Sequence, residues 1–203
     1  MLKLKKIALT GNLSCGKSSA CRFFKDYGAY VVSADEIVHR LLSPNTILGQ
    51  SILDLLGRDV LSPDGQFDRK KIAKIVFGKP LLLKALEAIV HPIVRQEINK
   101  AYNQAKEEQA SIFIAEIPLL FEGGMEAEYD ASIVIDTPEN KCIERFINNK
   151  ESNLKDYNLR MQNQLPRNEK LKKATFILKN EGSLDDLKSS VYLLFQKLTN
   201  YQE

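Results

Sequence analysis

The chain has 203 residues, of which 44% are hydrophobic and 27% are charged, and this composition excludes a disordered or fibrous protein. Its formal net charge of +3 is too small by itself to indicate a nucleic acid or an anionic membrane as a partner. The three cysteines lack metal-ligand spacing, and no apolar run approaches the length of a signal-peptide core or a membrane span, so we expect a reduced, cytoplasmic protein.

Strand and helix patterns alternate from the start of the chain, and its length suits one α/β domain with insertions. A buried strand is predicted over residues 4–10 and a helix over 17–26. A short strand over 30–33 follows, and a further helix begins near Ala34. From about residue 44 to residue 109 the periodicity is helical, broken by the turn SPDGQ, which indicates a helical insertion.

The strand pattern resumes after this insertion, in SIFIAEIPLL and again in ASIVIDTPEN, which leads into a helix over 141–149. A polar helical segment follows, then a last short strand within TFILKNEG and an amphipathic helix over 183–198. Strands that alternate with helices imply a mainly parallel sheet covered on both faces. We therefore predict an α/β fold in which residues 1–35 and 111–203 form the core and residues 36–110 a helical insertion.

The stretch GNLSCGKS, residues 11–18, lies between a predicted strand and a predicted helix and fits the phosphate-binding pattern G-x-x-x-x-G-K-[ST]. Successive amides in such a loop form a nest for an anion, and the positive end of the following helix adds to the field. Lys17 would reach the β- and γ-phosphates of a nucleotide, and the Ser18 hydroxyl would coordinate Mg²⁺. We expect the Lys17 side chain to face solvent before a nucleotide binds. The pattern assigns the triphosphate to Gly11, Ser14, Cys15, Gly16, Lys17, Ser18 and Ser19.

A phosphate-binding loop alone does not distinguish GTPases, ATPase motors and small-molecule kinases. A GTPase should carry the base-reading motif N-K-x-D, whereas the nearest string here is NKES at Asn149, which lacks the aspartate. The arginine and sensor segments of a motor are not found in the sequence. A small-molecule kinase needs a carboxylate near the acceptor hydroxyl, a domain that holds the acceptor and an arginine-bearing lid, and the chain offers a candidate for each.

The candidate carboxylate is Asp35, which follows the second predicted strand and so belongs at the carboxyl edge of a parallel sheet. It could accept the proton of the acceptor hydroxyl or help to orient the metal, or it could only cap a helix. Glu116 follows the apolar strand residues IFIA and could bind the water shell of the metal. Arg145, with Arg160 or Arg167, could reach across the phosphates, although a single arginine in such a segment is more often a solvated helix residue.

The sequence resembles the dephospho-coenzyme A kinase family over almost its whole length. The resemblance rests on LTG followed by GKSS, and then on GAYVVSADEIVHRLL, DGQFDRKKIAKIVF, LEAIVHP, EIPLLFE, ERF, RMQNQ and KNEG, in this order. It implies a three-layer P-loop kinase fold with a helical acceptor-binding insertion and a helical lid near residues 148–172. It also implies phosphorylation of the ribose 3′-hydroxyl of dephospho-coenzyme A, with ATP and Mg²⁺, as the last step of coenzyme A synthesis.

The resemblance implies roles for individual residues. Asp35 takes the position of the family's catalytic aspartate, where it would activate the hydroxyl, and Arg145 would neutralise charge that develops during transfer, beside Lys17. Asn180 and Gly182 would form a loop on the adenine side of the nucleotide. Substrate contacts are implied for Asp35, His39, Arg69, His91, Pro118, Leu119 and Glu122.

The chain departs from the family pattern at three positions. Ser33 stands where the family usually has a second carboxylate. Asn149 replaces an arginine one helical turn after Arg145, and Thr175 replaces an aspartate before the last strand. The last two departures bear on the details of the lid.

Two expectations come from the residues alone. Pro92 indicates a helix boundary at His91. Cys15, at the start of a helix, should have a lowered thiol pKa, and would serve either as a redox switch or as a small packing residue. Two rival functions stay open: another P-loop kinase, for a nucleoside monophosphate or a sugar, and a non-catalytic regulatory module that binds a nucleotide. We expect a monomer or weak homo-oligomer with neither nucleic acid nor membrane as a partner.

Overall fold

The structure of the protein is a computed structural model, and it describes residues 4–77, 79–148 and 153–200. Its contacts divide the described chain into two compact units. The sheet unit contains the residues up to Ser33 and those from Tyr102 onward, and the helical unit contains Ala34–Ala101. Most of the predicted insertion, residues 36–110, falls within the helical unit.

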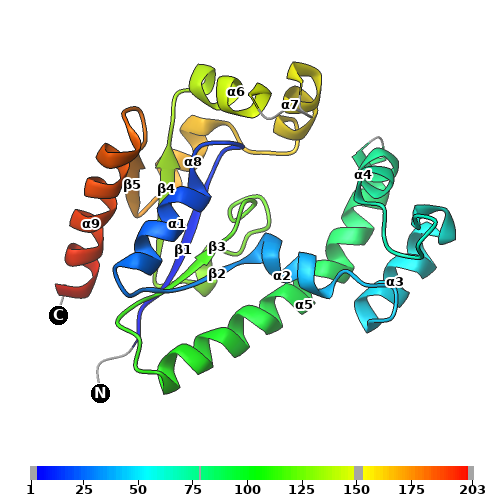
Figure 1. The fold of residues 1–203 in the computed structure, drawn as a ribbon, viewed down its shortest axis with the longest axis horizontal. Coiled ribbons are helices and arrows are strands. Elements are labelled where there is room, and N and C mark those ends of the chain that lie inside the picture. The colour runs from blue at the N-terminus through cyan, green and yellow to red at the C-terminus, as the bar shows by residue number, and fades with distance from the viewer. Residues whose placement is uncertain (1–3, 78, 149–152, 201–203) are drawn as a thin grey trace. The chain divides into compact units, whose positions relative to one another are not determined.

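The described part of the sheet unit contains five strands, which are parallel to their neighbours and are ordered β2-β3-β1-β4-β5 (Figure 1). The predicted parallel sheet is therefore confirmed. Because all the strands run in one direction, the residues that follow them meet at one edge of the sheet. The strands are β1 (Lys6–Gly11), β2 (Tyr30–Ser33), β3 (Phe113–Glu116), β4 (Ala131–Asp136) and β5 (Phe176–Lys179).

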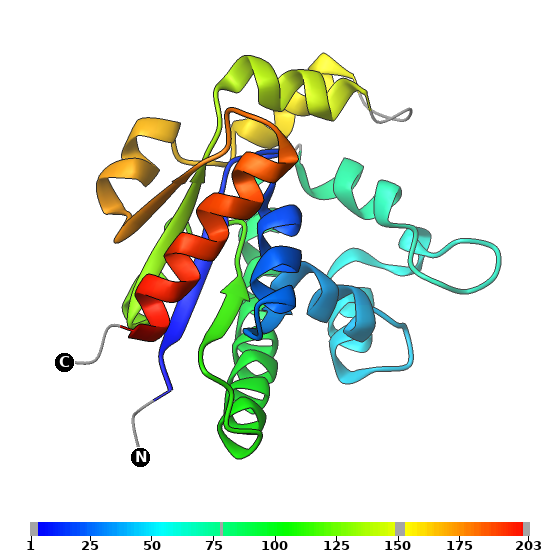
Figure 2. The same cartoon turned by 60° about the vertical axis from the view of Figure 1, so that its left-hand side comes forward.

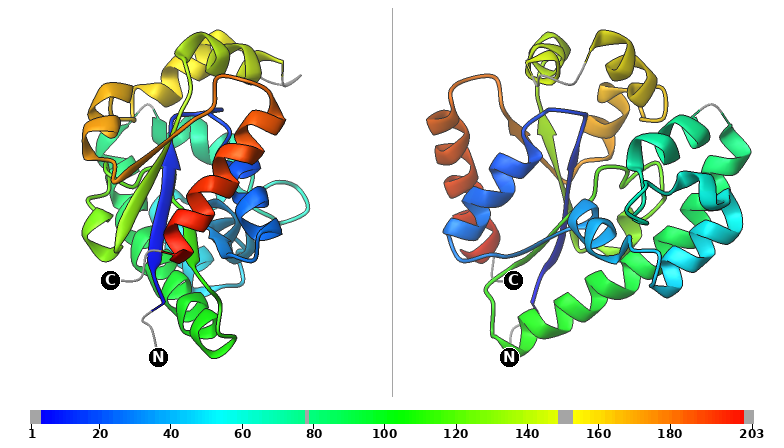
Figure 3. Two further views of the ribbon diagram at one scale, coloured as in Figure 1. Left: turned by 90° about the vertical axis from the view of Figure 1, so that its left-hand side faces the viewer. Right: turned by 45° about the vertical axis from the view of Figure 1, so that its right-hand side comes forward.

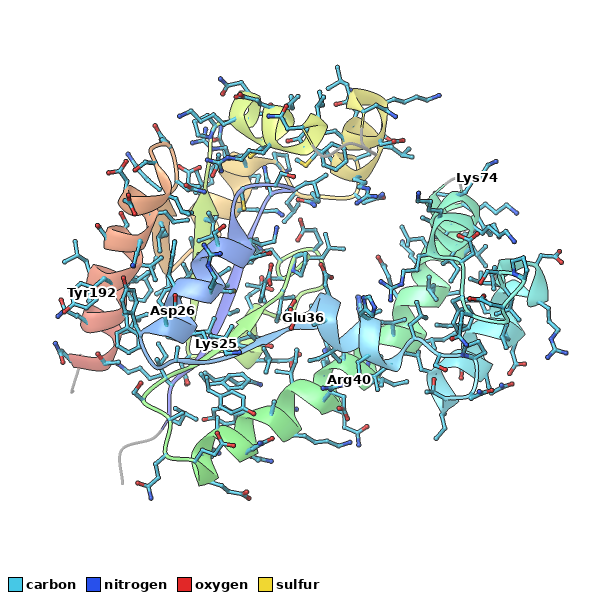
Figure 4. All side chains as sticks on the ribbon, in the orientation of Figure 1. Lys25, Asp26, Glu36, Arg40, Lys74 and Tyr192 are labelled. Carbon is cyan, nitrogen blue, oxygen red and sulfur yellow. The ribbon has the colours of Figure 1, made fainter. Side chains whose placement is uncertain are left out.

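Helices α1 (Lys17–Asp26) and α9 (Leu184–Asn200) cover one face of this sheet (Figure 2). The C-terminal end of α1, where Figure 4 labels Lys25 and Asp26, lies beside Tyr192 of α9. There the rings of Tyr27 and Tyr192 lie with their centroids 5.1 Å apart. Beneath the two helices lies an apolar core that includes Ile7, Leu9, Phe24, Ile114, Ile133, Ile135 and Val191.

The opposite face of the sheet carries α8 (Arg167–Lys173), as both views in Figure 3 show. The last turn of α5 (Pro80–Glu107) also belongs to the sheet unit, where Tyr102 packs edge-on against Phe113 and donates from its hydroxyl to the Leu4 carbonyl at 2.7 Å. Two short helices, α6 (Glu139–Ile147) and α7 (Leu154–Met161), lie beyond the carboxyl end of β4 (Figure 1). The edge-on rings of Phe146 and Tyr157 join these two helices.

The helical unit contains α2 (Ala34–Leu41), α3 (Ile47–Leu56), a 3₁₀ turn at Arg58–Val60, α4 (Arg69–Phe77) and most of α5. Thr46 caps α3 by accepting a hydrogen bond from the Gly49 amide at 3.0 Å. No helix in the described ranges combines the length and the apolar character needed to cross a membrane.

The predicted helix boundary at His91 is wrong, because α5 continues through Pro92. Proline lacks the amide that would bond to the Ala88 carbonyl, so this helix loses one internal hydrogen bond. Val94 and Ile98, one turn apart on the same face, are both buried beyond the proline. Their burial stabilises the helix on the C-terminal side of Pro92, where local preference alone predicted an end.

Candidate functional site

The loop between β1 and α1 has a backbone that requires glycine. Gly11 has φ 152° and Gly16, which precedes α1, has φ 100°. A Cβ atom on Gly11 would lie 2.6 Å from Cys15 Sγ and 2.8 Å from the carbonyl oxygen of Ile135. Ser14 also has a positive φ, of 57°. Such alternation of backbone conformation turns consecutive amides toward one side and forms an anion nest.

The amides at the start of α1 are available to a ligand. Within the ranges that the structure describes, the amides of Gly16, Ser18 and Ser19 donate to no protein acceptor. The Lys17 amide lies near enough to the Cys15 thiol to favour its thiolate form. Free amides at a helix N-terminus, together with the helix dipole, attract an anion. The loop can therefore hold a phosphate group.

The Lys17 side chain folds back over its own loop. Its ammonium donates to the carbonyls of Gly11 at 3.1 Å and of Asn12 at 3.0 Å, and the residue is half-buried. The expectation that it faces solvent is therefore wrong, because two backbone carbonyls on the far side of the loop lie within its reach. The arrangement places a positive charge beside the free amides.

The structure brings one of the three predicted arginines to this loop. A Cβ atom on Gly16 would lie 3.8 Å from Nη1 of Arg145, so the guanidinium on α6 lies beside the loop. Arg160 lies over the ring of Phe146, with its guanidinium carbon 5.7 Å from the ring centroid. Arg167 forms an ion pair with Asp136 through two hydrogen bonds, so among the described residues Arg145 is the predicted arginine with an observed approach to the loop.

The partner of Arg167 is Asp136, the buried last residue of β4. Nε of the arginine lies 2.5 Å from Oδ1 of the aspartate, and Nη2 lies 3.0 Å from Oδ2. This hydrogen bonding raises the pKa of the Arg167 guanidinium. The pair fixes the first turn of α8 to the carboxyl end of β4.

Glu122, a predicted substrate contact, has partners inside the sheet unit. Its Oε1 accepts from the Leu165 amide at 2.7 Å and lies 3.0 Å from Nζ of Lys170, while its buried Oε2 has no hydrogen-bond partner among the residues that the structure describes. Lys170 is 1% exposed and also donates to Gln164 at 3.2 Å. Burial lowers the pKa of Lys170, and the negative charge of Glu122 opposes that shift. This buried pair joins the segment after β3 to α8.

Asn180 and Gly182 follow β5, as predicted. Asn180 is buried, and its side-chain amide donates to the Cys15 carbonyl at 2.7 Å. Thr137, which the sequence analysis did not identify, donates to the same carbonyl at 2.8 Å. Gly182 is exposed, and a Cβ atom there would meet the Asp186 carboxylate.

Ser18 and Glu116 are the predicted metal residues. Ser18 is exposed in the first turn of α1, and Glu116 is the buried last residue of β3, in register with Leu9 of β1. No three acidic, histidine or cysteine side chains in the described ranges form a ready metal cluster. Mg²⁺ usually keeps several waters and takes one or two protein oxygens with the phosphates. One hydroxyl and one carboxylate therefore fit this ion.

The expectation of a lowered pKa for Cys15 is wrong. The thiol is 1% exposed, and this burial raises its pKa more than the charge and the amide of Lys17 lower it. Desolvation disfavours a thiolate even at a helix N-terminus. Cys15 fits the role of a small packing residue, with its sulfur under Gly11.

The remaining candidates lie on helices or after β3. Asp35 and His39 are exposed one turn apart on α2, and Nδ1 of His39 lies 2.8 Å from Nη1 of Arg69 on α4. His91, on α5, is half-buried. Pro118 and Leu119 are half-buried in the segment after β3. Asn149, and with it part of the predicted lid, lies outside the described residues.

Comparisons with known proteins give a consistent result. The family model described as dephospho-CoA kinase matches residues 5–186. A dephospho-CoA kinase of Protochlamydia amoebophila is 41% identical over 203 residues, which cover 99% of this chain and 100% of that protein. The crystal structure of TT1252 from Thermus thermophilus has a TM-score of 0.82 at 29% identity, covering 97% of this chain and 99% of that one. Dephospho-CoA kinase from Campylobacter jejuni has a TM-score of 0.69 at 30% identity, covering 96% and 97%.

Proposed function

The chain belongs to the dephospho-CoA kinase family, and we propose that it transfers the γ-phosphoryl group of ATP to the ribose 3′-hydroxyl of dephospho-CoA. It is a phosphotransferase with the P-loop kinase fold. The observation that carries the proposal is the loop from Gly11 to Ser18, with free amides at Gly16 and Ser18 and with Lys17 and Arg145 beside it. The product of this transfer would be coenzyme A.

Phosphoryl transfer needs charge stabilisation more than covalent chemistry. The free amides of Gly16, Ser18 and Ser19 would hold the phosphates. The Lys17 ammonium now donates to two neutral carbonyls, and charged phosphate oxygens are stronger acceptors. ATP would therefore draw Lys17 away from the loop backbone. Arg145 would neutralise the charge that develops on the transferred group.

A magnesium ion would neutralise phosphate charge when bound with ATP. The residues that would hold it are Ser18, through its hydroxyl, and Glu116, through water. Ser18 lies in the same turn of α1 as Lys17, so the two residues would act on neighbouring phosphates.

Asp35 is the proposed base for the acceptor hydroxyl. It is the second residue of α2 and follows the end of β2 by two positions. An exposed carboxylate can accept a proton from a hydroxyl, and little proton transfer is needed early in a loose transition state. His39, Arg69 and His91, in the helical unit, would contact the acceptor. Pro118 and Leu119 would contact it from the segment after β3.

The test measures ADP release from ATP and Mg²⁺ with and without dephospho-CoA, beside AMP, UMP, shikimate and gluconate. We expect ADP release to depend on dephospho-CoA. Turnover with AMP or UMP would instead support a nucleoside monophosphate kinase, and turnover with shikimate or gluconate another small-molecule kinase. ATP binding without turnover of any acceptor would support a regulatory module and would overturn the proposal.

A further inference from the structure

One carbonyl of the phosphate loop accepts two buried side-chain hydrogen bonds. Oγ1 of Thr137 donates to the carbonyl oxygen of Cys15 at 2.8 Å, and Nδ2 of Asn180 donates to the same oxygen at 2.7 Å. The three residues are 3%, 5% and 1% exposed for Thr137, Asn180 and Cys15. Both lengths are those of well-formed hydrogen bonds, and the burial shields them from competing water.

These two bonds fix the direction of an amide that belongs to the nest. The Cys15 carbonyl and the Gly16 amide are parts of one peptide plane, and in a trans peptide they point in opposite directions. The carbonyl is held toward Thr137 and Asn180, so the Gly16 N–H is held away from them. That N–H donates to no protein group within the described ranges and is one of the amides assigned to the phosphates.

The loop needs such an external constraint because of its glycine. Gly16 has φ 100°, a conformation that a residue with a side chain rarely adopts. Glycine also adopts other conformations at little cost, so the preceding peptide could rotate and turn a carbonyl toward the phosphates. A Cβ atom on Gly16 would collide with the Asn180 side chain, which shows that this asparagine lies directly against the glycine. The two donors supply the constraint that the glycine lacks.

The donors themselves are fixed by the sheet. Thr137 directly follows β4 and Asn180 directly follows β5, at the edge where β1 enters the loop. The Asn180 amide donates to the Asp136 carbonyl at 2.8 Å, which joins the two strand ends. The Asn180 carbonyl lies 3.3 Å from Oγ1 of Thr137. Neighbouring strands thus hold both side chains in place.

We propose that Thr137 and Asn180 are positioning residues, which hold the peptide between Cys15 and Gly16 with its amide directed at the phosphates of ATP. They act through the loop backbone and do not touch the nucleotide. The inference rests on the proposed function for its choice of ligand. The role assigned to Asn180 thereby changes: the residue supports the triphosphate nest and does not contact the adenine side of the nucleotide.

The test compares Thr137→Val, Thr137→Ser and Asn180→Ala. Valine keeps the shape of threonine and removes the donor, whereas serine keeps the donor. We expect Thr137→Val and Asn180→Ala each to raise the Kd and the KM for ATP about tenfold, the upper end for one hydrogen bond. We expect Thr137→Ser to stay within about twofold of wild type, and all three variants to keep the KM for dephospho-CoA within the same limit.

A matched control is Ser132→Ala, which removes a buried hydroxyl within β4 itself. Its Oγ accepts from the Thr175 amide at 3.1 Å, at a strand position paired with Ala8 rather than with the loop. This variant should lower the melting temperature and leave the Kd for ATP unchanged. If Thr137→Val lowers the melting temperature as Ser132→Ala does and leaves the Kd for ATP within about twofold, the residue is only structural and the proposal is overturned.

The Kd for ATP is measured by titration without an acceptor, so the result does not depend on the proposed reaction. A wild-type protein that binds ATP and fails to phosphorylate dephospho-CoA would reject the proposed function and leave the positioning test intact. If Thr137→Val does not fold, Asn180→Ala alone decides, because the same tenfold rise is expected. An unchanged Kd for ATP in that variant would overturn the inference.

Discussion

The two units of the molecule hold their candidate residues in different ways. In the sheet unit the phosphate loop is supported by buried contacts, because the Cys15 carbonyl accepts hydrogen bonds from the buried side chains of Thr137 and Asn180. In the helical unit Asp35, His39 and Arg69 are exposed on helices. Buried hydrogen bonds hold a side chain in one geometry, whereas an exposed one, such as that between His39 and Arg69, competes with water and constrains its side chains less.

This difference suits the two ligands proposed for the units. A triphosphate presents the same charged groups in every nucleotide, and a loop fixed in advance stabilises transfer without reorganisation. An acceptor such as dephospho-CoA is larger and more varied in its chemistry, and exposed side chains on helices can adjust to it.

Replacing Lys17 by Ala should have the largest effect on activity. The change removes the positive charge beside the nest, and we expect turnover to fall by about a thousandfold, the upper end for one stabilising donor. The fold should survive, because within the described residues the Lys17 side chain bonds to carbonyls of its own loop and joins no two elements. Steady-state kinetics measure the turnover, and far-ultraviolet circular dichroism tests whether the fold survives. A variant that unfolds, or one with normal turnover, would contradict the assignment of the loop.

Replacing Asp35 by Asn tests whether this residue of the helical unit is the base for the acceptor hydroxyl. Asparagine keeps the shape of the side chain in the first turn of α2, but it cannot accept the hydroxyl proton as a carboxylate does. We expect kcat to fall by at least about a hundredfold, on the order of 3 kcal/mol in the barrier, with little change in the affinity for ATP. Ser33, nearby in the chain, offers no second carboxylate. Turnover within about threefold of wild type at saturating ATP and Mg²⁺ would show that Asp35 is not the base.

Replacing Glu122 by Gln tests whether buried contacts carry the stability of the sheet unit. The change leaves the Lys170 ammonium buried opposite a neutral group, and we expect the free energy of unfolding to fall by about 2 kcal/mol. A matched control is Glu126→Gln, because Glu126 pairs with Lys173 at 3.0 Å in a more exposed place. That change should cost less than about 1 kcal/mol. If urea denaturation gives the same loss in the free energy of unfolding for both variants, burial of the Glu122–Lys170 pair does not contribute to stability.

The same variant makes a prediction for pH. Burial lowers the pKa of Lys170 in the folded protein below its ordinary value of 10.5, so the folded state releases its proton first as the pH rises. Without the Glu122 charge this pKa should fall further, and the cost of burying the ammonium should disappear at a lower pH than in wild type. The destabilisation by Glu122→Gln should therefore shrink as the pH rises toward about 10. A destabilisation that grows over this range would contradict the buried ion pair.

Replacing His39 by Ala should have the smallest effect. The side chain is exposed, and its Nδ1 lies 2.8 Å from Nη1 of Arg69, so its loss removes one surface hydrogen bond of the guanidinium. We expect the KM for dephospho-CoA to rise about threefold and the KM for ATP to stay unchanged, the size expected for one solvent-exposed contact. A larger rise in the KM for ATP than in the KM for the acceptor would show that His39 does not contact the acceptor.

The sequence predicted well those parts of the molecule that depend on short stretches. The helix over 17–26 and the strand over 30–33 have the predicted bounds, because apolar periodicity and glycine spacing are local signals. The phosphate loop was predicted for the same reason: its pattern spans eight neighbouring residues and requires a strand before it and a helix after it.

The parts that the sequence did not reveal depend on residues far apart in the chain. Thr137 and Cys15 are 122 positions apart, and Arg167 and Asp136 are 31 apart. No local pattern predicts such contacts, because they form only when the strands pair and α8 packs against the sheet. The pKa of Cys15 was misjudged for the same reason, since its burial depends on the packed fold and not on its place at a helix start.

The most direct test of the division between the two units is a crossed titration, with ATP and dephospho-CoA each added to Lys17→Ala and to Arg69→Ala. The account predicts that Lys17→Ala weakens ATP binding by about tenfold or more and leaves dephospho-CoA within about twofold. It predicts the opposite for Arg69→Ala, with dephospho-CoA weakened about fivefold and ATP unchanged. If Arg69→Ala weakens ATP more than dephospho-CoA, or if both variants weaken the same ligand alone, the proposed assignment of the nucleotide to Lys17 and of the acceptor to Arg69 is wrong.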